Sequence, residues 1–371
     1  MRSRPGLFFA LALVTCAVCV LAEQSWTVAR ADYPYAFPRD HFAHNNFQTE
    51  WWYYTGNLRA DNGHRFGYEL TFFRQAVHLE HTESISRTWL PDQMYLAHFA
   101  LSDLDGAGFF HTKRLNRRGP GLAGASEDRG CYWNGNWQVQ WIDERSGRQQ
   151  LQAVSDDGTL RLDLTPSKPP VVHGQHGLSV KGPLPGEASQ YVSFTRIASR
   201  GTLDWKGKHY AVSGSSWMDH EFFSEPADNE LEGWDWFAVQ LETGQELMLY
   251  RLRRKDGTSQ RFSSGTYVDE KGSARFLRGD DFTLTPLETW HSAASGQSYP
   301  VRWHISVPSL QLDLTEQTRL KSQELFSREA VSPTYWEGAV EYTGQMASQK
   351  VSGVGYLEMT GYAASIRLSG E

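Results

Sequence analysis

The densest group of ionisable residues is Asp219, His220 and Glu221, three consecutive positions inside the aromatic run Trp217–Phe223. In an extended segment, Asp219 and Glu221 point to one side and His220 to the other. A buried carboxyl group next to an imidazole has a raised or coupled pKa, which a general acid working near neutral pH requires. We therefore take these three residues as candidate catalytic residues for proton transfer. A surface loop with three solvated charges is the alternative.

Two further acidic residues each begin a repeated pattern. Glu50 precedes Trp51, Asp235 precedes Trp236, and each motif continues through a strand, a glycine turn and a second strand that ends in arginine. The two motifs are separated by about half the mature chain, which predicts two related domains. The two acids either line a ligand site or accept hydrogen bonds from an arginine or a backbone N–H, which is a structural role.

Aromatic residues are numerous, with 14 Trp, 16 Tyr and 19 Phe in 371 residues. Flat apolar rings suit a cavity for an apolar ligand, and a β-barrel of about eight strands can enclose one small ligand. The alternative is that the same rings fill an ordinary core. The candidate ligand-binding residues, including the two acids of the repeat, are Glu50, Trp51, Tyr53, Trp217, Trp234, Asp235, Trp236, Tyr250 and Trp336.

Other chemistry finds little support in the sequence. His41 and His44, with Glu50 and Glu69 nearby, could ligate a metal, but histidines without a second fixed pair rarely do. We therefore predict neither a metal nor a cofactor. The motifs GxSxG, GxxxxGK[ST] and HExxH do not occur, so a serine hydrolase, an NTPase and a zinc protease have no motif support. The formal net charge of −7 offers no basic surface for nucleic acid.

The elements that must position these residues are strands. Apolar and polar residues alternate at period two in segments such as Arg65–Arg74, Thr159–Leu164 and Leu310–Thr315, as in half-buried strands. Glycine-containing turn signals separate such runs. We predict an all-β chain of two antiparallel β-barrel domains packed against each other, at residues 33–200 and 205–371, because Ser199–Thr202 interrupts the strand pattern.

The N-terminal residues 1–22 predict a secretory signal peptide. Arg2 and Arg4 precede the apolar stretch Leu7–Leu21, whose 15 residues are short for a membrane span, which needs about 20. We expect cleavage near Ala22, a periplasmic or secreted protein, and no membrane span thereafter. Lipidation at Cys16 is the weaker alternative. After cleavage Cys131 is the single cysteine, so no intrachain disulfide can form.

Several motifs resemble the lipocalin-like carotenoid 1,2-hydratase superfamily, whose exported bacterial branch is called AttH-like. The segments that carry the resemblance span nearly the whole chain: His41–Leu58, Gly67–Gln75, Trp217–Phe222, Gly233–Leu241, Tyr335–Gly338 and Gly355–Tyr362. The resemblance implies two lipocalin-like β-domains with a ligand cavity at or near their contact.

The hydratases of this superfamily add water across an isoprenoid double bond, which requires a strong acid, aromatic faces and a placed water. The resemblance implies Asp219 as the proton donor, His220 as the residue that orients it, and Trp217, Trp236 and Tyr250 as pocket walls. The hydratases place an acid beside the residue equivalent to Tyr250, and this chain does not. Either another Glu or Asp takes that place, or the chemistry is absent.

Two functions are therefore expected. The first is an exported protein that binds a long apolar ligand, an isoprenoid or a lipid, and hydrates it as a hydro-lyase. The alternative is a non-catalytic periplasmic carrier of such a ligand that works with an envelope ABC-type transporter.

Overall fold

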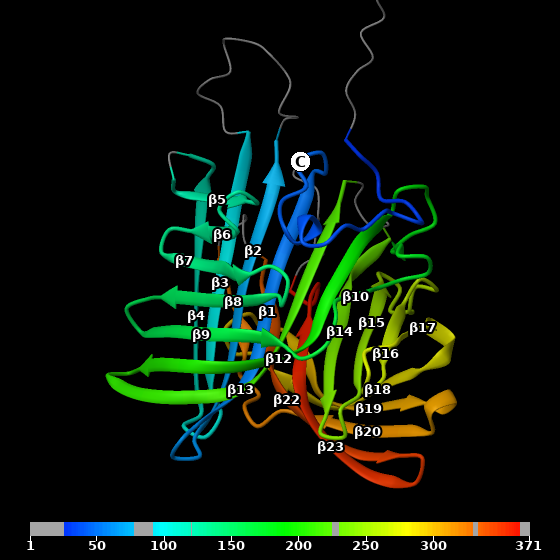
Figure 1. Cartoon of the computed structure of the whole chain (residues 1–371). Coiled ribbons are helices and arrows are strands. Elements are labelled where there is room, and N and C mark those ends of the chain that lie inside the picture. Colours follow the sequence, from blue (N-terminus) through cyan, green and yellow to red (C-terminus); the bar gives the residue numbers. More distant parts are fainter. Residues whose placement is uncertain (1–25, 78–91, 120, 225–229, 329–332, 364–371) are drawn as a thin grey trace, which may run out of the picture.

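The computed structural model describes residues 26–77, 92–119, 121–224, 230–328 and 333–363 (Figure 1). The predicted signal segment, residues 1–22, lies outside the described residues. The described residues contain the 3₁₀ turns η1 (Arg39–His41), η3 (Gly279–Asp281) and η4 (Pro308–Leu310) beside the strands. No helix in the described ranges is long and apolar enough to cross a membrane. The predicted all-β class is confirmed.

The first sheet is antiparallel and curls into a nearly closed barrel. Its strands are β1 (Thr49–Ala60), β2 (Arg65–Ala76), β3 (Gln93–Asp103), β4 (Gly108–Arg117), β5 (Ala123–Ser126), β6 (Cys131–Asn134), β7 (Trp137–Asp143), β8 (Arg148–Val154), β9 (Gly158–Pro166), β10 (Val171–Val172), β11 (Ser179–Val180), β12 (Ala188–Trp205) and β13 (Lys208–Phe223). The strand order is β4-β3-β2-β1-β13-β12-β9-β8-β7-β6-β5, and β10 and β11 pair with β12. Asn134 of β6 bridges the remaining gap, because its side chain donates to the Tyr95 carbonyl of β3 at 3.0 Å.

The second sheet forms a half-barrel beside the first (Figure 1). Its strands are β14 (Leu231–Leu241), β15 (Glu246–Arg254), β16 (Ser264–Val268), β17 (Ala274–Arg278), β18 (Thr283–His291), β19 (Ser298–Val307), β20 (Leu312–Gln317), β21 (Glu324–Leu325), β22 (Tyr335–Met346) and β23 (Gln349–Met359). The order is β17-β16-β15-β14-β23-β22-β20-β19-β18, with β21 on β22.

The two sheets repeat the same plan, which confirms the internal similarity read from the sequence. Glu50 of β1 lies directly across from Arg74 of β2, and Asp235 of β14 lies across from Arg251 of β15. In each sheet the first strand of this hairpin also pairs with the last strand of the unit, β13 or β23. The predicted boundary at residues 200–205 falls inside β12, and the chain changes sheet later, between β13 and β14.

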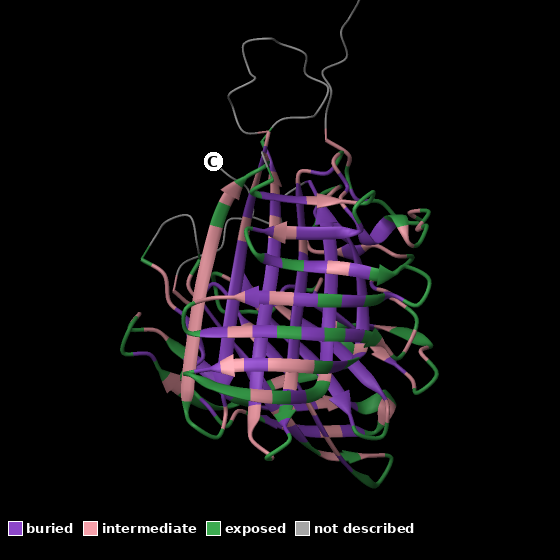
Figure 2. Cartoon of the chain, turned by 60° about the vertical axis from the view of Figure 1, so that its left-hand side comes forward, coloured by how far each residue is buried: buried purple, intermediate pink, exposed green. Residues whose placement is uncertain are grey.

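Side chains alternate between the two faces of every strand, and this alternation produces separate cores. One core fills the barrel and a second fills the half-barrel. A third cluster lies between the sheets and includes Tyr53, Tyr191, Trp217, Trp236, Tyr250 and Tyr356. Figure 2 shows the consequence: some strands are banded in buried and exposed residues, as β9 is, whereas β1 and β2 are buried almost throughout.

Strands β1 and β2 of the barrel pack against β22 and β23 of the half-barrel. The Asn57 side chain donates to the Gly355 carbonyl at 2.9 Å. At Gly67 the approach is so close that an added Cβ atom would lie 2.6 Å from the Cβ of Ala339 and 3.2 Å from the Tyr356 hydroxyl. The contact between the sheets therefore depends on a glycine in β2.

Replacing Gly67 by valine should destabilise the protein by about 1–3 kcal/mol. The reason is that no space remains between Gly67 and Ala339 for the added side chain. Denaturant unfolding would measure the change. Arg59→Val, at an exposed position of β1, is the control and should change stability by about 0.5 kcal/mol or less. A Gly67→Val protein as stable as the wild type would show that β2 and β22 do not approach this closely.

Candidate functional site

The third cluster and the acids beside it form a layer between the two sheets, which we call the interface layer. In the barrel, Tyr53 lies directly across from Asp219, and in the half-barrel Trp236 lies across from both Tyr250 and Glu358. The layer consists of the aromatic residues Tyr53, Tyr191, Trp217, Trp236, Tyr250 and Tyr356 and the acids Glu69, Asp219, Glu221, Glu337 and Glu358. Four predicted ring positions and the predicted proton donor thus meet at one contact.

Asp219 is the acid of this layer that lies among the tryptophans. Its Oδ1 accepts hydrogen bonds from Trp217 Nε1 at 2.6 Å and from the Ser193 hydroxyl, and its Oδ2 accepts one from the Tyr191 hydroxyl at 2.6 Å. These bonds favour the carboxylate, but burial outweighs them and raises the pKa of Asp219 to about 7. Asp219 can therefore both give and take a proton near neutral pH.

Aromatic rings from both sheets surround this carboxyl. The Trp236 ring lies edge-on to Trp217 at 6.0 Å and to Tyr53 at 5.4 Å between centroids. Trp236 Nε1 also donates to the Tyr191 hydroxyl at 3.0 Å, so Tyr191 connects the half-barrel to Asp219. Trp51 and Trp234, which the sequence also indicated, are only partly buried and pack at the border of the layer.

Glu221 faces the layer as predicted, but a partner that the sequence did not indicate holds it. Its Oε1 lies 3.1 Å from Lys181 Nζ and accepts from the Ser189 hydroxyl. Burial lowers the pKa of Lys181, but the Glu221 carboxylate outweighs this and raises it overall. The ammonium lies 4.2 Å from the centre of the Tyr250 ring. Glu221 is therefore bound in an ion pair, unlike Asp219.

The sequence reasoning placed none of three acids in the layer: Glu69 of β2, which it named only beside a possible metal site, Glu337 of β22 and Glu358 of β23. Desolvation raises the pKa of Glu69 to about 7 and that of Glu358 to about 8. Glu358 lies directly across from Trp236 and retains some accessible surface. Of the three, Glu358 lies on the other side of Trp236 from Tyr250, whose own strand lacks an acid beside it.

Trp336, a predicted ligand-binding residue, is not part of the layer. Its ring is fully buried in the half-barrel core, where Nε1 donates to the Lys321 carbonyl at 2.7 Å. Because side chains alternate along β22, its neighbours Tyr335 and Glu337 point to the opposite face instead. The motif Tyr335–Gly338 contains both Trp336 and Glu337, but it does not show which of the two side chains faces the other sheet.

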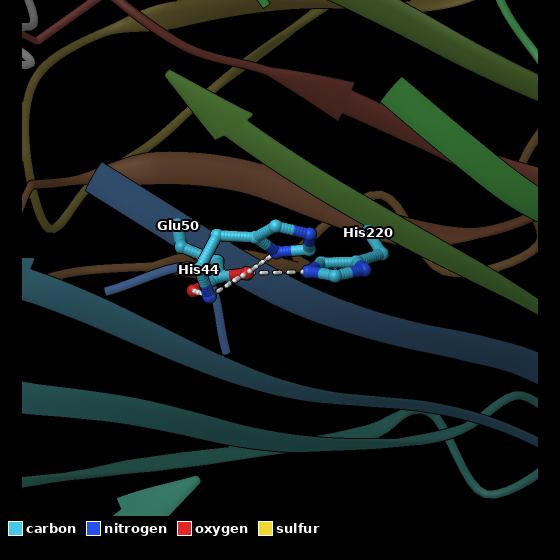
Figure 3. A group of neighbouring side chains, drawn as sticks. All are labelled: His44, Glu50 and His220. Carbon is cyan, nitrogen blue, oxygen red and sulfur yellow. Dashed lines mark hydrogen bonds and ion pairs between the residues drawn. The ribbon is translucent and has the colours of Figure 1, made fainter. Parts of the chain in front are cut away.

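His220 lies on the opposite face of β13 from Asp219, next to Glu50 and His44 (Figure 3). Its Nε2 lies 2.7 Å from Glu50 Oε1, and its ring stacks on Trp52 at 5.0 Å. The expected alternation within Asp219–Glu221 is confirmed. The expected contact in which His220 orients Asp219 is not made.

Glu50 is the centre of this fully buried group. It accepts from Arg74 Nε at 2.9 Å and from the backbone N–H of His44 at 3.0 Å, and its Oε1 lies 2.8 Å from His44 Nδ1. Burial alone would raise the pKa of Glu50, but the Arg74 guanidinium and the histidines hold it below its ordinary value. Asp235, the matched acid of the half-barrel, accepts from Arg251 Nε at 2.8 Å. Both acids make the hydrogen bond to an arginine that the structural role requires, and a ligand contact of either one stays a prediction.

The ligand atoms of His44, Glu50 and His220 lie within 4.8 Å of one another, a set that could in principle hold a metal ion. The second oxygen of Glu50 is already paired with the Arg74 guanidinium. His44 Nε2 is bound to Asp40 at 3.1 Å, so both nitrogens of that ring face a carboxylate. The charges of the group balance without a metal, and its geometry is that of a buried ion-pair network.

Comparison with known proteins agrees with this architecture. The AttH-like family model matches residues 28–362. The chain belongs to the AttH-like family. No curated protein matches it significantly.

Two solved structures are similar to this AttH-like chain over nearly its whole length. A Nitrosomonas europaea protein assigned as an AttH is 32% identical, with a TM-score of 0.81, covering 91% of this chain and 99% of that one. Kievitone hydratase from Nectria haematococca is 16% identical, with a TM-score of 0.70, covering 92% of this chain and 97% of its own. The second likeness shows the shared fold.

Replacing Arg74 by methionine should destabilise the protein by about 3–5 kcal/mol, because it leaves the Glu50 carboxylate buried without its guanidinium partner. The free energy of unfolding from urea titration measures the effect. Arg161→Met, at an exposed position of β9, should be nearly neutral. Equal stability of the two variants would contradict the role assigned to the Glu50–Arg74 pair.

Proposed function

We propose that this AttH-like protein binds a long apolar ligand, an isoprenoid or a lipid, in the interface layer and adds water across one of its C=C bonds. The observation that carries the proposal is Asp219, a buried carboxyl with a pKa of about 7 among tryptophan rings where the two sheets meet. A general acid is most effective when its pKa lies near the working pH. Export to the envelope, expected from residues 1–22, belongs to the same proposal.

The reaction would proceed in two steps. The Asp219 carboxyl transfers its proton to one alkene carbon, the π electrons form the new C–H bond, and the other carbon becomes a cation. The faces of Trp217 and Trp236 stabilise that cation through their negative quadrupole. A water molecule attacks the cation to form the C–O bond and releases one proton to the Asp219 carboxylate. Glu358, which retains accessible surface, would hold that water.

The family assignment and the fold support this proposal. A hydratase, kievitone hydratase, shares the fold. The missing acid beside Tyr250 has a replacement in Glu358, which lies on the other side of Trp236 from Tyr250. The three hydrogen bonds that already satisfy Asp219 favour the second candidate function instead. That candidate is a periplasmic carrier that passes an unaltered ligand to an envelope transporter.

Asp219→Asn should reduce turnover by roughly 100-fold or more, since the amide cannot donate a proton as an acid does. The assay would use lycopene as a linear isoprenoid probe in ¹⁸O-water and detect the mass of the hydrated product. Quenching of Trp fluorescence gives the affinity, which should stay within a few-fold. Asp163→Asn, at an exposed position of β9, should turn over like the wild type. An unchanged rate in Asp219→Asn would exclude Asp219 as the acid.

Turnover in the wild type should fall as the pH rises through about 7, because Asp219 is raised to that pKa and loses the proton it must donate. The measurement is kcat/KM between pH 5 and 9. A rate that increases with pH would contradict an acid mechanism. Saturable quenching without any hydrated product at any pH would support the carrier instead.

A further inference from the structure

Two buried glutamates from different sheets meet in the interface layer. Glu69 of β2 accepts, at Oε1, hydrogen bonds from the Thr71 hydroxyl at 2.9 Å and the Tyr335 hydroxyl at 3.1 Å. Glu337 of β22 accepts, at Oε1, a hydrogen bond from the Tyr53 hydroxyl. Among the described residues, no donor reaches the Oε2 atom of either side chain, although both atoms are buried. Each carboxyl therefore has one satisfied oxygen and one that needs a partner.

The two carboxyl groups lie close enough to form a hydrogen bond with each other. Two carboxylate ions cannot make such a bond, because neither has a donor and their charges repel. One proton between the groups supplies the donor and removes one charge. This arrangement satisfies both Oε2 atoms without any further residue.

The groups around this pair supply no positive charge. Tyr53, Tyr335 and Tyr356 face it from β1, β22 and β23, and Glu358 faces it from β23 as a further acid. His98 of β3 bonds Tyr335 through Nδ1 at 2.6 Å, but burial lowers the pKa of His98 to about 3, so that ring is neutral. In the part of the chain that the structure describes, neither Glu69 nor Glu337 forms an ion pair with Lys or Arg.

We propose that Glu69 and Glu337 bind a single proton between them and that this proton holds the half-barrel against the barrel. The site is distinct from Asp219 and requires no ligand or turnover, so it stands or fails independently of the proposed hydration. By accepting from Tyr53, the pair also fixes a ring that contacts Trp236 in the wall of the interface layer.

The proton belongs to the folded state only, since an unfolded glutamate has a pKa of about 4.3. Above that pH the folded protein binds one proton more than the unfolded chain, and stability falls as the pH rises until the pair gives up its proton. Each linked proton changes the unfolding equilibrium constant tenfold per pH unit. The pKa values of Asp219 and Glu358 are also raised, so these two residues make stability fall with rising pH in the same way. Both must therefore remain unchanged in every variant that is compared.

The experiment is thermal and urea unfolding of the full chain between pH 5 and 9. In Glu337→Gln the amide N–H can donate to the Glu69 carboxylate, so the bond no longer needs a proton. We expect this variant to lose the dependence on one linked proton. Its unfolding equilibrium constant should then rise about tenfold less per pH unit than that of the wild type. Glu69→Gln should behave in the same way. Glu341→Gln, on the same strand and ion-paired with Arg319, is the control and should keep the wild-type slope.

Wild-type slopes in both glutamine variants would overturn the proposal. So would failure of both variants to fold at every pH, because either amide supplies the missing donor. A wild type that is stabilised by Ca²⁺ and destabilised by EDTA would also overturn it, since the two Oε2 atoms would then share a cation rather than a proton.

Discussion

Desolvation of carboxyl groups between two packed sheets is the constraint on which the rest of this structure depends. The barrel and the half-barrel turn toward each other one face that is rich in tyrosine and tryptophan and contains five acids. Within the described part of the chain, only Glu221 of these five has an ammonium partner, Lys181. Charged carboxylates are costly in such surroundings, so the others hold or share protons at pH values where exposed acids are ionised. The proton transfer proposed for Asp219 and the proton proposed to join the two sheets then have the same physical cause, which is desolvation of the carboxyl groups.

Buried acids have two kinds of partner in this chain. Those paired with arginine have a structural role, and the one held by neutral donors is the proposed proton donor. At the ends of the barrel and the half-barrel, Glu50 and Asp235 each lie across from an arginine and are fully compensated. In the interface layer, Asp219 is held by three neutral donors and keeps a pKa near 7. A compensated carboxylate stabilises the fold, and a neutral-donor site leaves the proton available.

Much of this could be predicted from the sequence, because alternation and turn signals are local. The all-β class, the repeated hairpin and the meeting of Tyr53, Trp217, Asp219, Trp236 and Tyr250 were all within reach. Which face of a strand becomes the contact is a tertiary property that alternation leaves open. Trp336 was therefore grouped with residues of the opposite face, and Glu69, Glu337 and Glu358 were not placed in the layer. His220 was matched with the wrong carboxyl. The change of sheet was placed too early for the same reason, because β13 completes the barrel only through its pairing with β1.

The central claim is that an apolar ligand lies between the sheets and not inside the barrel. Photo-crosslinking with a diazirine-bearing isoprenoid, followed by residue-level mass spectrometry, tests it most directly. The account predicts labels on side chains of the interface layer, foremost Tyr53, Trp217 and Trp236, that an excess of unlabelled lycopene removes. Competable labels on the barrel-core residues Tyr54 and Tyr132 would contradict it and would place the ligand inside the barrel.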